Sequence, residues 1–189
     1  MTHYPLLPSR AFTLIETVIV IGFSTSMMLA LGLVTYHFNK ILTYEQTASW
    51  SSGSASTLMR EIGSLVLPAR AVLQTHTFSG TVYTSTSTVL VLEIPSIDNS
   101  GSVIANTFDY AVVYASSTEA YRVLAAHASS KRVSGTKKLS STISSLIFTY
   151  NNTDFTQVST TTVDVQTRAY AKQDMLTDHR SEQMRLRNH

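Results

Sequence analysis

An almost unbroken apolar run near the N-terminus, residues 14–34, constrains this chain of 189 residues more than any other feature. At a rise of 1.5 Å per residue, roughly 20 apolar residues in a helix cross a hydrocarbon core about 30 Å thick. The hydroxyl residues Ser24, Thr25 and Ser26 are compatible with such a span, because their side chains can hydrogen-bond to helix carbonyls. The sequence therefore predicts a transmembrane helix.

A carboxylate, Glu16, lies in the first turns of this apolar segment. Ionisable side chains inside a membrane are costly and usually mark function. An acidic residue at a helix N-terminus can also simply complement the helix dipole, which is worth less than about 1 kcal/mol. Arg10 and His3 precede the span, whereas Lys40 and Glu45 follow it. This asymmetry of basic residues predicts an N-terminus in the cytoplasm and most of the chain outside it.

Residues 10–16, Arg-Ala-Phe-Thr-Leu-Ile-Glu, together with the apolar run resemble the class III signal of type IV pilins and of type II secretion pseudopilins. The resemblance implies that a prepilin peptidase cuts between Ala11 and Phe12 and methylates the new N-terminus at Phe12. It also implies that Glu16 pairs with the Phe12 amine of a neighbouring subunit during filament assembly. The residue before the cut is most often Gly in this family, and Ala11 is a small residue that the family tolerates.

Two other interpretations of the apolar run make different demands. A secretory signal peptide has an apolar core of about 7–15 residues and a small-residue cleavage site after it. This run is longer, and no such site follows it. A plain signal anchor accounts for the length and the topology but has no need of Glu16. It remains an alternative, in which Phe12 never becomes an N-terminus.

Beyond the span, the hydrophobic period shows where helix gives way to sheet. Residues 36–72 keep a helical rhythm, in which Leu58, Ile62, Leu65 and Val66 recur at three- and four-residue spacing. Pro68 is expected to start the last turns of this helix, which should end by about residue 74. Trp50 and Met59 are expected to pack on the globular domain. From residue 78 the period is two, and strands are predicted over residues 88–94, 108–114, 121–124, 143–150 and 163–171. Pro95 is expected to end the first of these.

Sequence patterns also indicate the structure of two segments further along the chain. Residues 131–138 are predicted to form a polar, basic loop. The tail, residues 184–189, resembles the closing strand of J-type pseudopilins and W-type minor pilins. The pattern of residues 89–95 also resembles the sequences of those proteins. A short charged helix over residues 175–187 is the alternative.

The expected fold class is therefore α+β, with a long N-terminal helix, half membrane-spanning and half amphipathic, packed on a C-terminal antiparallel β-sheet. We divide the chain into a leader (1–11), a transmembrane and assembly helix (12–35), the amphipathic half of the helix (36–74) and an extracytoplasmic β-rich domain (75–189).

Catalytic motifs are absent from the sequence: it contains no Gly-x-Ser-x-Gly elbow, phosphate loop or His-Glu-x-x-His. Cysteine is absent and the six histidines are scattered, so we expect no enzyme, no metal site and no cofactor. Asp98, Asn99 and Asp109 invite comparison with the calcium loop of some pseudopilins. Asp and Asn shortly before Gly101 are more simply a turn.

A basic cluster, Lys131, Arg132, Lys137 and Lys138, raises the possibility of DNA contact, as in minor pilins of competence systems. Such a loop is more often just solvated, and the formal net charge of +2 does not favour a nucleic-acid binder. DNA is therefore the least favoured partner, and a DNA-binding or adhesive minor pilin is an alternative function.

The function that the resemblance implies is that of a minor pilin or pseudopilin, a structural subunit of a type IV pilus or type II secretion filament. Its implied partners are the prepilin peptidase, other subunits through the N-terminal helix, an inner-membrane assembly platform, and the lipid bilayer before assembly. Its expected location is the cytoplasmic membrane as a single-pass protein, and a periplasmic or cell-surface filament after assembly. The sequence leaves the choice between secretion, pilus and competence systems open.

Overall fold

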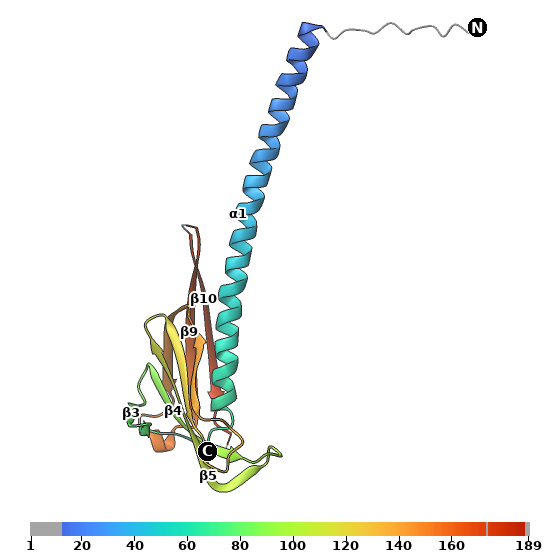
Figure 1. Ribbon diagram of the computed structural model, residues 1–189. Helices are drawn as coiled ribbons and strands as arrows, with labels where there is room; N and C mark the ends of the chain where they lie inside the picture. The colour runs from blue at the N-terminus through green and yellow to red at the C-terminus, as the bar shows by residue number, and fades with distance from the viewer. Residues whose placement is uncertain (1–12, 173, 188–189) are drawn as a thin grey trace, which may run out of the picture. The chain divides into compact units, whose positions relative to one another are not determined.

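The computed structural model describes residues 13–172 and 174–187. In this part of the chain, a long helix α1 (Leu14–Val66) is followed by antiparallel β-structure (Figure 1). This arrangement confirms the predicted α+β fold class. The chain divides into two compact units with a boundary between Tyr44 and Glu45, so that α1 contributes its first part to one unit and its last part to the other.

Within the described residues the strands form three antiparallel sheets. A five-stranded sheet has the order β1-β4-β5-β6-β7, a three-stranded sheet the order β10-β9-β8, and β2 and β3 form a hairpin. The strands are β1 (Ala71–Val72), β2 (Thr75–Phe78), β3 (Thr81–Thr84), β4 (Val89–Ile97), β5 (Val103–Ser116), β6 (Glu119–Ala125), β7 (Gly135–Ser140), β8 (Ile143–Tyr150), β9 (Thr160–Ala171) and β10 (Asp174–Arg185). A short 3₁₀ helix, η1 (Phe155–Gln157), precedes β9.

The main core joins the last part of α1 to both larger sheets. Apolar side chains at three- and four-residue spacing make one buried face of the helix, which is the pattern that an amphipathic helix requires. This face packs with inward side chains of the five-stranded sheet, such as Leu92, and of the three-stranded sheet, such as Phe148. The helix residues of this face are Ala55, Leu58, Met59, Ile62, Leu65 and Val66.

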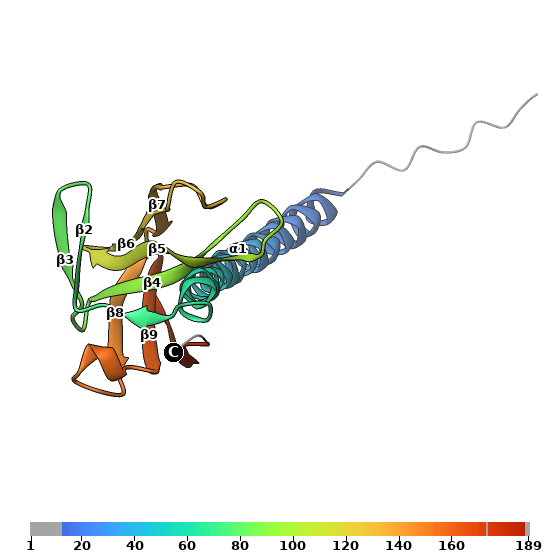
Figure 2. The same cartoon turned by 90° about the horizontal axis from the view of Figure 1, so that it is seen from below.

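The two larger sheets are also tied to each other by β8. Figure 2 shows β8 and β9 crossing beneath β4, β5 and β6. Two backbone hydrogen bonds fix the crossing: Ile143 N–H donates to Thr118 O (2.9 Å), and Phe148 N–H donates to Ser87 O (2.8 Å). The inward residues of β8 therefore complete the same core that the helix enters.

A second, smaller apolar cluster covers the opposite face of the five-stranded sheet. Successive residues of a strand point to opposite faces, so Val91 faces away from Leu92 and the helix. Phe78 of the β2–β3 hairpin packs there with Val91 and Val112. The His76 ring stacks on Tyr110 with a centroid distance of 3.9 Å. The hairpin thus closes a face that would otherwise expose apolar side chains.

The helix ends earlier than the sequence predicted. It stops at Val66 rather than near residue 74, because Pro68 has no N–H to continue the helix and disfavours the helical conformation at Leu67. Arg70 N–H already donates to Glu93 O (2.8 Å), which begins the pairing with β4. Residue 74, the predicted limit of the helix, therefore lies between β1 and β2.

Most predicted strands are present, with differences at β4, at β7 and in the tail. Strand β4 continues past Pro95 to Ile97 through a shift in register. Residues 135–138, predicted as loop, belong to β7 and pair with β6. The tail is strand β10 rather than the alternative helix, although it begins at Asp174, before the predicted start, and its last predicted residues lie outside the described part of the chain.

Truncation at the centre of the main core gives a direct test of this packing. Ile62 is fully buried, and replacing it with Ala removes apolar contact and leaves a cavity. We expect Ile62→Ala to lower the free energy of unfolding by about 2–5 kcal/mol. Leu67→Ala is the control, because that side chain is 46 % exposed and its loss should cost less than about 0.5 kcal/mol. Guanidinium unfolding in detergent micelles, followed by near-UV circular dichroism, measures both; equal losses would contradict the assignment of the core.

Candidate assembly surface

The first part of α1 presents apolar side chains on every side. The helix contains an 18-residue window with a mean hydropathy of 2.1, none of which is buried within the protein. Large side chains are exposed along its whole length up to Tyr44, among them Leu14 (85 %), Phe23 (74 %) and Met28 (74 %). A helix that is hydrophobic all round needs lipid or other helices as its surroundings. We call residues 14–44 the apolar half of α1.

Several hydroxyl groups in the apolar half donate to a backbone carbonyl one turn earlier. Thr25 Oγ1 donates to Ile21 O (2.7 Å), and Ser26 Oγ donates to Gly22 O (2.9 Å). These bonds confirm the sequence prediction for Thr25 and Ser26. They matter because lipid offers no hydrogen-bond partners to polar groups.

Glu16 caps the beginning of the helix. Its Oε2 accepts hydrogen bonds from Thr13 N–H (2.9 Å) and Thr13 Oγ1 (3.0 Å), while Glu16 N–H donates to Thr13 Oγ1 (3.4 Å). This reciprocal pattern is a capping box, which satisfies helix N–H groups that lack a partner in the preceding turn. As a local role for Glu16, sequence reasoning considered the helix dipole and overlooked the capping box, although the Thr-x-x-Glu spacing indicates it. The predicted cleavage site, Ala11 and Phe12, lies outside the described residues.

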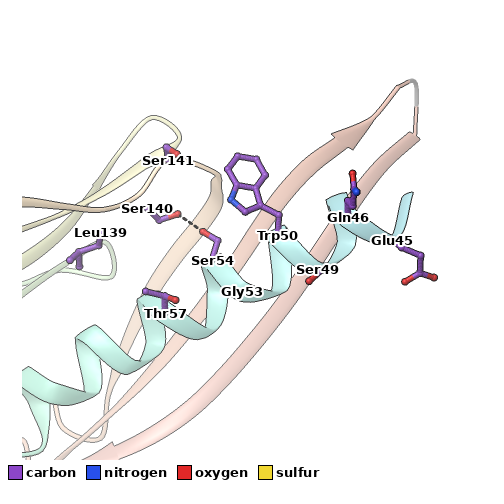
Figure 3. A pocket seen from close by; sticks show the side chains of 10 residues that line it. All are labelled: Glu45, Gln46, Ser49, Trp50, Gly53, Ser54, Thr57, Leu139, Ser140 and Ser141. Atoms are coloured by element: carbon purple, nitrogen blue, oxygen red, sulfur yellow. Dashed lines mark hydrogen bonds between the residues drawn. The ribbon is translucent and has the colours of Figure 1, made fainter. Parts of the chain in front are cut away.

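An open groove of about 870 Å³ runs beside α1 in the second unit. Figure 3 shows Trp50 of α1 on one side of this groove and the β7–β8 turn on the other. The hydroxyl of Ser54 on the helix lies 3.0 Å from the hydroxyl of Ser140 at the end of β7. Met59 is buried as predicted, but Trp50 is 62 % exposed because its helix face turns toward this groove rather than into the core. The lining residues are Glu45, Gln46, Ser49, Trp50, Gly53, Ser54, Thr57, Leu139, Ser140 and Ser141.

The four basic residues proposed for DNA contact do not form one free basic surface. Arg132 Nη1 lies 2.7 Å from Asp109 Oδ2, and Lys138 Nζ lies 2.9 Å from Glu119 Oε1. Lys131 Nζ donates to Asn99 O (3.3 Å). Acidic partners therefore offset much of the positive charge that DNA would require.

Lys137 has a structural role beneath the helix. It stands opposite Arg122 on the neighbouring strand, and like charges in such a cross-strand pair repel. Glu61 of α1 forms an ion pair with each of them: its Oε1 lies 2.8 Å from Lys137 Nζ, and its Oε2 lies 3.9 Å from Arg122 Nη1. The hydrogen bond from Lys137 lowers the pKa of the Glu61 carboxyl, against the opposing effect of partial burial. This contact ties α1 to the β6–β7 edge of the sheet.

Asp109 is a buried anchor that sequence reasoning missed. Its side chain is fully buried and accepts four hydrogen bonds of 2.7–2.8 Å, from Ser96 Oγ, His127 N–H, Ser130 Oγ and Arg132 Nη1. Burial raises the pKa of the Asp109 carboxyl, but these donors together outweigh burial and hold that pKa below its ordinary value. The carboxylate therefore fixes the segment that leads into β7.

The acidic residues considered for calcium are used in other ways. Asp98 Oδ1 accepts from Ser100 N–H (2.8 Å) and Ser102 N–H (2.9 Å), which is the predicted turn. Asp109 faces its own donors in the interior, as described above. No group of three or more potential metal ligands occurs among residues 13–172 and 174–187.

Comparisons of the chain with protein-family models, with curated proteins and with solved structures each found no match. The likeness to pilins therefore consists of the architecture: a long apolar N-terminal helix whose later part packs against antiparallel sheets.

The Asp109 anchor predicts a pH-dependent stability. Because the folded-state pKa is lowered, the stabilisation is present above the ordinary carboxyl value near pH 4 and is lost as pH falls through the folded pKa. We expect Asp109→Asn to lower the free energy of unfolding at pH 7 by about 3–5 kcal/mol, since Arg132 loses its buried partner. The difference between wild type and variant should shrink below about pH 4.

Urea unfolding in detergent micelles at several pH values measures this difference. Glu182→Gln on the exposed face of β10 is the matched control and should change stability by less than about 0.5 kcal/mol. A difference between wild type and Asp109→Asn that does not vary with pH would contradict the role of the Asp109 charge.

Proposed function

We propose that this chain is a structural subunit, a minor pilin or pseudopilin, of a filament assembled from the cytoplasmic membrane. In this proposal a prepilin peptidase removes the leader after Ala11 and methylates Phe12. The subunit is stored in the bilayer through the apolar half of α1 and passes to the filament through an inner-membrane assembly platform. We expect no enzymatic activity.

The observation that carries the proposal is the contrast between the two parts of α1. Residues 55–66 bury one apolar face in the core, whereas the apolar half leaves its side chains uncovered. A plain lipid anchor would explain the uncovered side chains and would leave Glu16 only its role as a helix cap. Packing with the same helix of other subunits would cover these side chains and give the Glu16 charge a partner as well.

The role of Glu16 has to be separated from its capping role. As a cap it completes hydrogen bonds with Thr13, which is a local matter within one chain. As an assembly residue its charge would compensate the Phe12 amine of a neighbour, because an unpaired charge buried between helices costs several kcal/mol. An amide at position 16 can still accept the hydrogen bonds of a capping box. The two roles therefore respond differently to Glu16→Gln.

The DNA-capturing alternative has less support. Arg132, Lys137 and Lys138 each lie within 3 Å of a carboxylate oxygen of Asp109, Glu61 or Glu119. Phosphate contacts would have to compete with these ion pairs. In the signal-anchored alternative, residues 1–11 stay on the chain and the domain takes no part in a filament.

Replacement of Glu16 tests the proposal. We expect both Glu16→Ala and Glu16→Gln to leave leader cleavage intact and to block incorporation into filaments, because both remove the charge. Quantitative immunoblotting of sheared filaments against the membrane fraction measures incorporation. Thr13→Ala is the matched control: it removes the hydroxyl of the capping box, keeps the Glu16 charge and should still be incorporated.

Different results would assign Glu16 differently. Normal incorporation of Glu16→Gln together with failure of Glu16→Ala would mean that capping, not charge, is what assembly needs. Normal incorporation of both variants would overturn the proposed contact.

A further inference from the structure

We propose that Lys40 and Glu45 form a second contact between neighbouring subunits, in which Lys40 of one copy of this chain pairs with Glu45 of the next along parallel α1 helices. The inference rests on the proposed function, because it requires copies to pack side by side. It adds a contact outside the predicted membrane span, where sequence reasoning used Lys40 and Glu45 only to infer the topology.

The first observation is the sparse charge along this part of the helix. Between Thr13 and Arg60, the Asp, Glu, Lys and Arg residues of α1 are Glu16, Lys40 and Glu45 alone. Lys40 and Glu45 are both exposed. Neither has an ion pair among the salt bridges of the described residues, whereas Glu61 further along has two. Both charges are thus available to a neighbour.

The second observation is that the two charges cannot pair within one helix. On a helix, residues three or four apart face each other, whereas residues five apart point in different directions. Lys40 and Glu45 are five residues apart. Figure 3 shows the Glu45 side chain extending away from the ribbon at one end of the groove, without a partner among the residues drawn. Among the described residues Glu45 therefore has no ionic partner, and its carboxylate is free to meet a cation of a neighbouring copy.

The spacing matches the displacement that the proposed function already requires. Phe12 precedes Glu16 by four residues in the sequence, so pairing the amine of one copy with Glu16 of the next displaces parallel helices by about 6 Å. The same displacement places Lys40 of the first copy beside residue 44 of the second. Glu45 is one residue, or about 1.5 Å of rise, further on, well within the reach of a lysine side chain.

The order of the charges selects the geometry of the assembly. In both pairs the cation comes first in the sequence and the anion follows, so one direction of displacement satisfies both. Each copy then offers an anion to one neighbour and a cation to the other, which is a heterologous contact that repeats without closing. Such a contact builds a filament rather than a symmetric dimer. An ion pair that is exposed to water contributes little to stability. Where neighbouring helices exclude water, an unpaired charge is costly, and the pair of Lys40 and Glu45 would then set the register of the helices.

Charge reversal tests the pairing. In Lys40→Glu or Glu45→Lys alone, two like charges meet at each contact, and we expect incorporation into filaments to fall by about fivefold or more. The combined variant K40E/E45K restores opposite charges at the same displacement, and we expect incorporation near the wild-type level. Arg60→Glu, on the exposed surface of the same helix, is the matched control and should have no comparable effect. Unchanged incorporation of the single variants, or no rescue in the combined variant, would overturn the pairing.

Disulfide crosslinking tests the displacement itself, on a background that has no native cysteine. Two differently tagged copies are co-expressed, one carrying Lys40→Cys and the other Glu45→Cys, and filaments are oxidised. We expect mixed-tag dimers in clear excess over those from two copies that both carry Lys40→Cys. An excess for the second combination would mean that the helices lie without displacement and would overturn the inference.

The two proposals fail in distinguishable ways. If the chain is not a filament subunit, the wild type itself is absent from filaments. If the chain is a subunit but this pairing is wrong, the wild type and both single variants appear in filaments at equal levels.

Discussion

The structure depends on a single helix that must satisfy two different surroundings. Over residues 55–66 its apolar side chains keep to one face and fill the space between two sheets. Over residues 14–44 they lie on every side and remain uncovered. Burial of apolar area drives both folding and association. Residues 55–66 therefore stabilise the domain, whereas residues 14–44 require a membrane or neighbouring helices around them.

Charges then determine how precisely the parts are held. Within the domain, Glu61 fixes α1 to two cations that would otherwise repel each other across β6 and β7. Asp109 does the same for the segment before β7, with Arg132 as its ionic partner. In the proposed assembly, Glu16 and the pair of Lys40 and Glu45 play the equivalent part between chains. In each case apolar contact supplies the attraction, and a few placed charges select one arrangement.

The sequence was sufficient for the fold class and for most of the strands, because hydrophobic periods of 3.6 and 2 are local signals. It was insufficient where the local structure depends on contacts with residues far away in the sequence. Pro68 was placed inside the helix, although its missing N–H ends the helix and frees Arg70 to pair with Glu93. Residues 135–138 were too polar to be recognised as a strand, since Lys137 owes its place to Glu61 of the helix.

The candidate site divides in the same way. Glu16 and the apolar half of α1 were recognisable from a short motif and from composition. Asp109 was considered only as a calcium ligand, because its four donors lie 13 to 23 residues away in the sequence and no local pattern joins them. The exposure of Trp50 likewise depends on which helix face the sheets cover, which spacing alone did not decide.

Assembly in the proposed filament depends on processing of the N-terminus, which mass spectrometry of the N-terminal peptide from native membranes measures. We expect a peptide that begins at Phe12 with a methylated amine. A chain that retains residues 1–11 in cells with an active prepilin peptidase would contradict it, and α1 would then be a plain membrane anchor.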